Sequence, residues 1–161
     1  MAYPIGQYRI DGIDLYLIYG ITIASGSNDL LRFPERKESV EHDWSDRNGI
    51  DKDTSRVFFK ARDISLECNL IANSEADFWA KYNAFLGMLA QPGERRLEVA
   101  EFNANYFLIY IKCDSFTRFT RIKENPGKIA CKFTTTLREL KPQVDPSNQY
   151  LITEPGVFMI T

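Results

Sequence analysis

The sequence has few of the residues that enzymes use for chemistry. It contains one histidine, His42, and three cysteines that form no Cys-x-x-Cys pair. It also lacks a Gly-x-Ser-x-Gly motif, a phosphate-binding glycine loop and a dinucleotide fingerprint. Nucleophilic catalysis needs a nucleophile beside a base, and a metal site needs several ligands at short spacing. The sequence therefore predicts a protein that is not an enzyme and that holds no metal and no cofactor.

Long apolar runs and a strong net charge are missing as well. No run approaches the roughly 20 residues that a membrane helix needs. Residues 1–6 lack the basic start and apolar core of a signal peptide. A formal net charge of −2 gives no long-range attraction to nucleic acid. We expect a protein without a membrane partner that is made and folded in a cytosol.

The three cysteines fit this expectation. Cys68, Cys113 and Cys131 each lie inside an apolar, strand-like stretch. Their odd number favours reduced thiols that pack as small apolar side chains. A disulfide between two of them stays open at this point.

Aromatic side chains, in contrast, are abundant. Of the 161 residues 13% are aromatic, with eleven Phe and eight Tyr, and aromatic residues favour pleated, half-buried surfaces. The length allows one domain with little more than an extension. We expect a mainly β, α+β fold, an antiparallel β-sandwich or split barrel with one flanking helix at about residues 75–90.

The helix has clear start and stop signals. Ser74 can cap its first turn, and Asp77 follows three residues later in a Ser-x-x-Asp box. Apolar residues then recur at helical spacing: Phe78, Tyr82, Phe85, Leu86 and Leu89. Gln91-Pro92-Gly93 ends the pattern. This apolar stripe predicts a helix that lies on a sheet or plugs the end of a barrel.

Strand-like segments stand on both sides of the helix. Before it, a turn at residues 10–15 leads into a strand that residues 16–18 extend, and further strands are expected at residues 21–23, 38–44, 56–61 and 64–72. After it, strands are expected at residues 97–102, 106–113, 115–123 and 128–140. Asn48-Gly49 predicts a long, solvated hairpin loop, and Asn125-Pro126-Gly127 predicts a turn between the last two strands.

Two segments suggest contact with a partner. Residues 106–111 are apolar on both faces, which is typical of a strand at the centre of a core or of one half-buried by a partner. Residues 141–161 carry short apolar patches between proline-containing turns and have no core of their own. We therefore divide the chain into a β domain, residues 1–140, and a C-terminal arm, residues 141–161.

Charged residues leave two alternatives open. Basic and aromatic residues interleave near the last hairpin, which fits a solvated face, a charged contact between subunits or single-stranded nucleic acid: Arg118, Arg121, Lys123, Lys128 and Lys132. Acidic residues gather between residues 35 and 53, and they fit solvated loops or a hydrolase: Glu35, Glu38, Glu41, Asp43 and Asp46. The hydrolase requires two carboxylates that converge in a cleft within roughly 10 Å.

The order of these signals resembles a known family. The ordered set is Ile10-Asp11-Gly12-Ile13-Asp14, Tyr19-Gly20-Ile21, residues 30–37 (LLRFPERK), Trp44, Asn48-Gly49, residues 62–68 (RDISLEC), a helix that ends at residues 89–93, Leu97-Glu98-Val99, residues 106–110 (YFLIY) and the strand at residues 127–140. Over roughly residues 8–141 it resembles the N-terminal ring-forming domain of phage distal tail proteins. That domain is similar to phage tail tube proteins and to the tube protein of type VI secretion systems.

The resemblance implies a structural role. It implies a hexameric ring of identical subunits in a virion tail, made in the cytoplasm of a host bacterium and placed between the tail tube protein and the baseplate hub proteins. DNA would only pass through the lumen. Larger members carry a second, carbohydrate-binding-like domain, whereas only an arm follows the ring domain here, so glycan binding is not expected.

We expect a set of aromatic residues to contribute to the subunit contacts: Trp44, Phe58, Tyr106, Tyr110, Tyr150 and Phe158. Trp44 also fits a second interpretation, as a residue that packs within the core or its own hairpin. The alternative function is a monomeric ligand-binding β-barrel whose helix closes one end and whose aromatic residues line a pocket.

Overall fold

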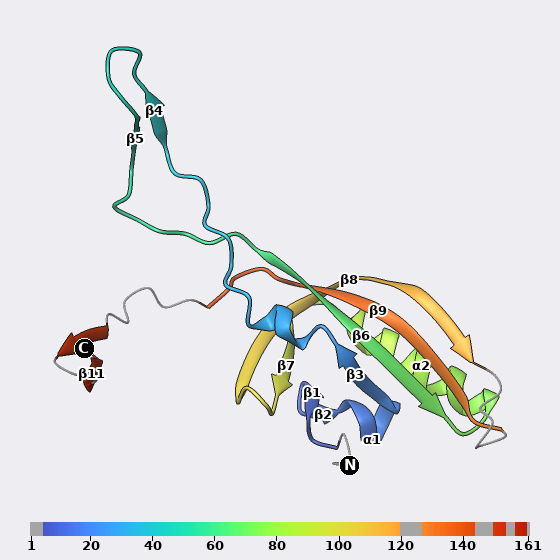
Figure 1. The fold of residues 1–161 in the computed structure, drawn as a ribbon. Coiled ribbons are helices and arrows are strands. Elements are labelled where there is room, and N and C mark those ends of the chain that lie inside the picture. Colours follow the sequence, from blue (N-terminus) through green and yellow to red (C-terminus); the bar gives the residue numbers. More distant parts are fainter. Residues whose placement is uncertain (1–4, 120–126, 144–149, 154–156, 161) are drawn as a thin grey trace.

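The computed structural model describes residues 5–119, 127–143, 150–153 and 157–160. Its main feature is a seven-stranded antiparallel sheet with strand order β2-β1-β7-β8-β9-β6-β3 (Figure 1). The strands are β1 (Tyr8–Ile10), β2 (Ile13–Asp14), β3 (Ile21–Ser25), β6 (Arg62–Ala72), β7 (Arg95–Val99), β8 (Ala104–Phe119) and β9 (Ile129–Glu139). The sheet does not close into a barrel. The predicted mainly β, α+β class is confirmed, and the barrel required by the ligand-binding alternative is not formed.

The pair β6–β9 forms the centre of the core. The two strands pair over their whole length, from Arg62 opposite Glu139 to Ala72 opposite Ile129. Apolar residues at alternate positions of both strands are buried: Ile64, Leu66, Cys68, Leu70, Ile129, Cys131, Phe133 and Leu137. Both strands were predicted, because strict alternation places every second side chain on one face.

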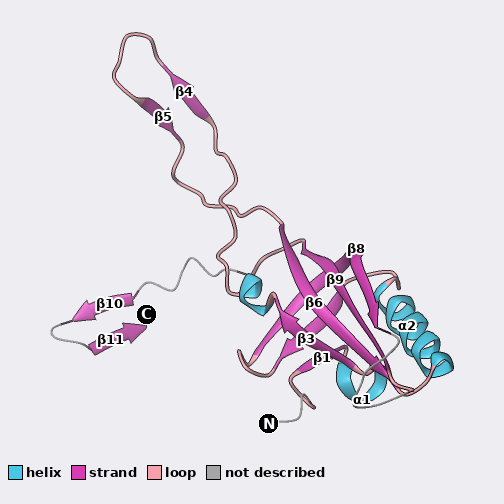
Figure 2. Cartoon of the chain, turned by 45° about the vertical axis from the view of Figure 1, so that its right-hand side comes forward, coloured by secondary structure: helices cyan, strands magenta, loops and turns pink. Residues whose placement is uncertain are grey.

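The helix α2 (Glu75–Leu89) packs against this sheet (Figure 2). Its buried face carries Phe78, Phe85 and Leu89. The Phe85 ring lies 6.1 Å from the Phe133 ring and 5.8 Å from the Tyr19 ring. The helix is therefore confirmed within one residue of the expected bounds, on a sheet and not in a barrel mouth.

The N-cap of α2 gives a first prediction. The Ser74 hydroxyl accepts a hydrogen bond from the Asp77 N–H at 3.2 Å, which satisfies one of the free N–H groups of the first turn. We expect Ser74→Ala to lower the free energy of unfolding by about 1 kcal/mol. Urea unfolding followed by circular dichroism measures the change, with Ser45→Ala in an exposed turn as control. An unchanged midpoint for Ser74→Ala would contradict the capping role.

Residues 16–18 were predicted as a strand, and this is wrong: they lie in a short helix, α1 (Leu15–Tyr19). The Asp14 carboxylate accepts hydrogen bonds from the N–H groups of Tyr16 and Leu17, both at 2.9 Å, and so caps the turn. Gly20 ends it with φ of 64°, where a Cβ would lie 2.5 Å from the Ile71 carbonyl oxygen. A 3₁₀ turn, η1 (Ser27–Leu30), follows β3 and buries Leu30.

The Asp14 carboxylate makes the stability of the fold depend on pH. Burial would raise the pKa of this carboxyl group, but hydrogen bonds from the N–H groups of Leu17, Gly6 and Tyr16 outweigh it, so the pKa lies below its ordinary value of 3.8. The contribution of Asp14 is therefore complete above pH 3.8 and is lost as the pH falls through the folded-state pKa. Thermal melts at decreasing pH should show a steeper loss for the natural chain than for Asp14→Asn. Parallel curves would contradict this role.

Two other strand predictions need correction. Residues 106–113 and 115–123 were predicted as separate strands, but β8 runs unbroken from Ala104 to Phe119. The pairing of β8 with β9 shifts its register after Tyr110 and again after Asp114. Residues 56–61 form no strand, only an isolated bridge between Phe59 and Arg36. The turn predicted at Asn125-Pro126 lies outside the described residues.

The cysteines are free, as predicted. Cys68 and Cys131 are buried, and Cys113 is half-buried. Burial raises the pKa of the Cys68 thiol to about 12, so this sulfur stays protonated and packs as an apolar group.

Candidate interaction surface

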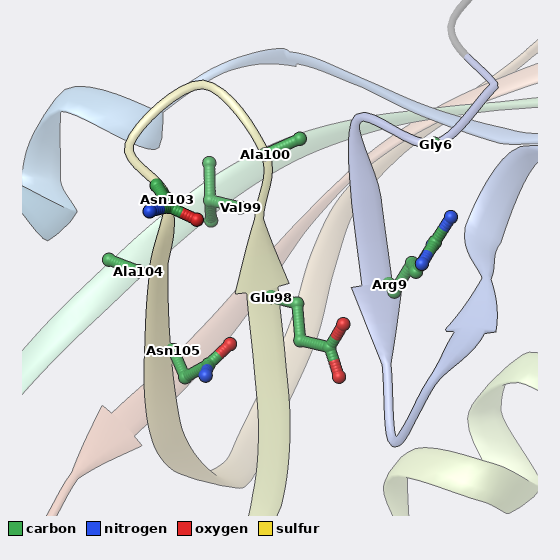
Figure 3. A pocket seen from close by; sticks show the side chains of 8 residues that line it. All are labelled: Gly6, Arg9, Glu98, Val99, Ala100, Asn103, Ala104 and Asn105. Carbon is green, nitrogen blue, oxygen red and sulfur yellow. The ribbon is translucent and has the colours of Figure 1, made fainter.

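One hollow of the sheet is small and polar. It measures about 270 Å³ and lies where β1 faces the turn between β7 and β8 (Figure 3). Its lining residues are Gly6, Arg9, Glu98, Val99, Ala100, Asn103, Ala104 and Asn105. None of them is a serine, threonine, cysteine or histidine, and the carboxylate of Glu98 pairs with Arg96 at 2.6 Å. This hollow offers no nucleophile and no second carboxylate.

The acidic residues proposed for a hydrolase do not form a site. All five lie along an exposed hairpin, and two are paired: Glu35 with Lys60 at 3.2 Å and Glu41 with Lys52 at 3.1 Å. Among the residues that the structure describes, no group of three or more His, Cys, Asp or Glu is placed to hold a metal ion. Within the same part of the chain, no helix has the length and apolar character to cross a membrane.

That hairpin is the most unusual part of the molecule. Residues 31–61, here called the projecting hairpin, leave the sheet after η1 and return at β6 (Figures 1 and 2). Its two sides pair at the base, where the Lys60 N–H donates to the Glu35 carbonyl at 2.7 Å. They pair again near the tip through β4 (Glu41–Asp43) and β5 (Ile50–Lys52). The predicted long, solvated loop at Asn48-Gly49 is confirmed, with Gly49 at φ of 89°.

The projecting hairpin exposes large apolar side chains along its whole length. The members that are more than a third exposed are Leu31, Phe33, Val40, Trp44, Ile50, Val57 and Phe58. Phe58 is 62% exposed and Val40 83%. Trp44 is 46% exposed and packs only on its own hairpin, with its ring 3.9 Å from that of His42, so it is not a core residue. A two-stranded ribbon is marginally stable alone in water, and this one also exposes its apolar residues.

A buried ion pair fixes the base of the projecting hairpin. Arg62 and Glu139 meet at 2.5 Å, with side chains only 12% and 6% exposed. The Arg62 guanidinium also donates to the Arg32 carbonyl and lies 6.0 Å from the centre of the Tyr106 ring. Burial raises the pKa of the Tyr106 hydroxyl, although the Arg62 charge opposes this. Arg62 therefore connects both sides of the hairpin to β9 and β8.

The strand that was expected to be apolar on both faces has one face covered by the core and one face that is partly exposed. Tyr106 and Tyr110 pack as half-buried residues against the core, together with buried Leu108. Their neighbours on the other face, Phe107 and Ile111, are 41% and 38% exposed. The alternating pattern placed these two pairs of residues on opposite faces of the strand, but only the fold shows which face is covered. Phe107 and Ile111 are thus candidate contact residues that the sequence did not single out.

Two of the described basic residues near the last hairpin form ion pairs, and Lys128 forms none among the described residues. Arg118 pairs with Glu75 on α2 and lies 4.8 Å from the centre of the Phe78 ring, and Lys132 pairs with Glu67 at 3.1 Å. These two pairs reduce the positive charge that this hairpin offers to a phosphate backbone. Arg121 and Lys123 lie outside the described residues.

Tyr150 and Phe158 belong to the C-terminal arm. They lie on β10 (Tyr150–Thr153) and β11 (Val157–Ile160), which pair only with each other in a separate two-stranded sheet. Their side chains are outside the described part of the structure, so their role in a contact stays a prediction.

No protein-family model matches the sequence. No curated protein matches it either. One similar solved structure is that of the SPP1 Dit (gp 19.1) protein, described as a paradigm of hub adsorption apparatus in Gram-positive infecting phages. The superposition has a TM-score of 0.47 and 13% sequence identity and covers 81% of this chain. This chain spans less than half of that protein, 48% of its length.

Proposed function

We propose that this protein is a structural component of a phage or prophage tail that assembles with copies of itself into a ring. In this proposal residues 1–140 form the ring domain, and residues 141–161 form an arm that contacts neighbours. The ring, with six copies, stands between the tail tube protein and the baseplate hub proteins, and the protein catalyses no reaction. The order of signals along the sequence supports a tail protein, and the exposed apolar residues of the projecting hairpin support self-assembly.

The observation that carries the proposal is the projecting hairpin. An isolated ribbon that exposes Phe33, Trp44 and Phe58 is costly for a monomer, because each large apolar side chain gains roughly 2 kcal/mol when it is buried. In a homo-oligomer, a neighbouring copy of the chain can cover these apolar side chains on every subunit. Repetition of one head-to-tail contact closes into a ring when the rotation between neighbours permits.

Electron microscopy of the purified full chain tests the ring directly. We expect negatively stained annuli with a central hole, and six-fold symmetry in class averages. Uniform particles of a size that fits an 18.6 kDa monomer, at micromolar concentration and above, would contradict the proposal.

A further inference from the structure

Charge is segregated along the projecting hairpin. Its tip, residues 41–53, carries the acidic residues Glu41, Asp43, Asp46, Asp51 and Asp53 and the basic residues Arg47 and Lys52, for a net charge of −3. Its base, residues 31–40 and 54–61, carries the basic residues Arg32, Arg36, Lys37, Arg56 and Lys60 and the acidic residues Glu35 and Glu38, for a net charge of +3. The two ends are therefore equal and opposite.

The excess charges form no ion pairs with other described residues. Two ion pairs, Glu41–Lys52 and Glu35–Lys60, join charges within the same end. No ion pair among the described residues involves Asp43, Asp46, Arg36 or Lys37. Ten residues of extended backbone separate Arg36 from Asp46, which is roughly 30 Å. At physiological salt the screening length is about 8 Å, so the two ends of one hairpin do not neutralise each other.

A hollow at the base of the projecting hairpin carries charge opposite to that of the tip. It measures about 310 Å³ and lies where the base meets the end of β9. Its lining includes Phe58, 62% exposed, and Leu140, 43% exposed, and its charged residues are Lys37 and Lys141. No acidic residue lines it. An acidic segment with one large apolar side chain is the chemistry that this hollow fits.

The tip of the hairpin has that chemistry. Trp44 is half-exposed and stands next to Asp43, and Asp46 follows two residues later. Trp is one of the residues enriched at the energetic hot spots of protein interfaces, and surrounding charges favour the right partner and orientation.

We propose that the tip of one copy docks into the base hollow of a second copy. The Trp44 ring contacts Phe58 and Leu140 of the second copy, while Asp43 and Asp46 face its Lys37 and Lys141. Each copy offers one tip and one hollow, so the contact runs head to tail. This inference rests on the proposed self-assembly and names the surfaces that would carry it.

Charge exchange tests the contact. One variant reverses the tip (Asp43→Lys with Asp46→Lys), and a second reverses the hollow (Lys37→Glu with Lys141→Glu). Each alone places like charges together, and we expect association to weaken at least about tenfold, measured by sedimentation of the full chain. An equimolar mixture brings opposite charges together again and should recover association to within about threefold. Glu94→Lys with Glu101→Lys, exposed acids at the ends of β7, is the matched control and should associate like the natural chain.

The outcomes separate this inference from the ring. Loss in both variants with recovery in the mixture supports tip-to-base docking, even when microscopy shows open chains or pairs and the ring proposal fails. Full association of both variants overturns the docking but leaves the ring in place through other surfaces. A natural chain that stays monomeric at every concentration overturns both.

Discussion

Glu139→Gln is expected to lower the free energy of unfolding by about 3 kcal/mol or more. The substitution removes the charge that balances Arg62 while it keeps the size of the side chain. Because both side chains are nearly buried, the guanidinium would remain in the protein without its counter-charge. Removal of one partner of a buried ion pair costs roughly 3–5 kcal/mol. Guanidinium unfolding followed by tryptophan fluorescence and circular dichroism gives the difference.

Two further variants show whether the loss comes from the unpaired charge. Arg62→Met with Glu139→Gln removes both charges, and we expect it to be more stable than Glu139→Gln alone, since no buried charge is left unpaired. Glu67→Gln, in an exposed pair with Lys132, should change stability by less than about 1 kcal/mol. A small effect of Glu139→Gln, equal to that of Glu67→Gln, would show that the pair does not fix the base of the hairpin.

Trp44→Ala is expected to weaken self-association by about thirtyfold or more without a change in the fold. An interface anchor contributes about 2 kcal/mol or more, and each 1.4 kcal/mol is a factor of ten in the dissociation constant. Trp44 contributes nothing to the core, so the thermal unfolding of the subunit should stay the same. Sedimentation equilibrium over a concentration series measures the association.

The chain contains its own control for this variant. Trp79, on the outer side of α2, is 47% exposed, nearly the same as Trp44 at 46%, and its indole N–H donates to Glu75 at 2.8 Å. Trp79→Ala removes the same amount of exposed aromatic surface from a part of the molecule that is not proposed to dock. Equal losses in the two variants would mean that tryptophan surface in general drives association, and the specific contact would be wrong.

The core elements could be predicted because their signals are local and repeated. β6 and β9 alternate over many residues, and α2 combines a cap, a helical stripe and a Pro-Gly stop. The short run Leu15–Tyr19 has no such redundancy, because five apolar residues fit a strand or a buried helix equally well. The Asp14 cap decided between them, and that signal was present in the sequence.

The surface was less predictable for a physical reason. Periodicity shows which residues share a face, but exposure depends on which other strands and helices cover that face. Trp44 and Phe58 were singled out for their residue type and are exposed. Tyr106 and Tyr110 were singled out in the same way, yet their strand turns Phe107 and Ile111 outward. The turn and the charges of residues 31–61 predicted a long, solvated loop but not how far it projects from the sheet. The base of the hairpin is fixed by the ion pair of Arg62 with Glu139, which is distant in the sequence.

Hydrogen exchange as a function of protein concentration tests the central claim most directly, since it measures whether copies of the chain cover the projecting hairpin. Amides of β6 and β9 should be protected at every concentration, because they belong to the core. We predict that amides at the tip and base of the hairpin exchange rapidly in dilute protein and become protected as the concentration rises, and that Trp44→Ala needs about thirtyfold higher concentration or more for the same gain. Rapid exchange of the hairpin amides at all concentrations, in protein whose core stays protected, would contradict it.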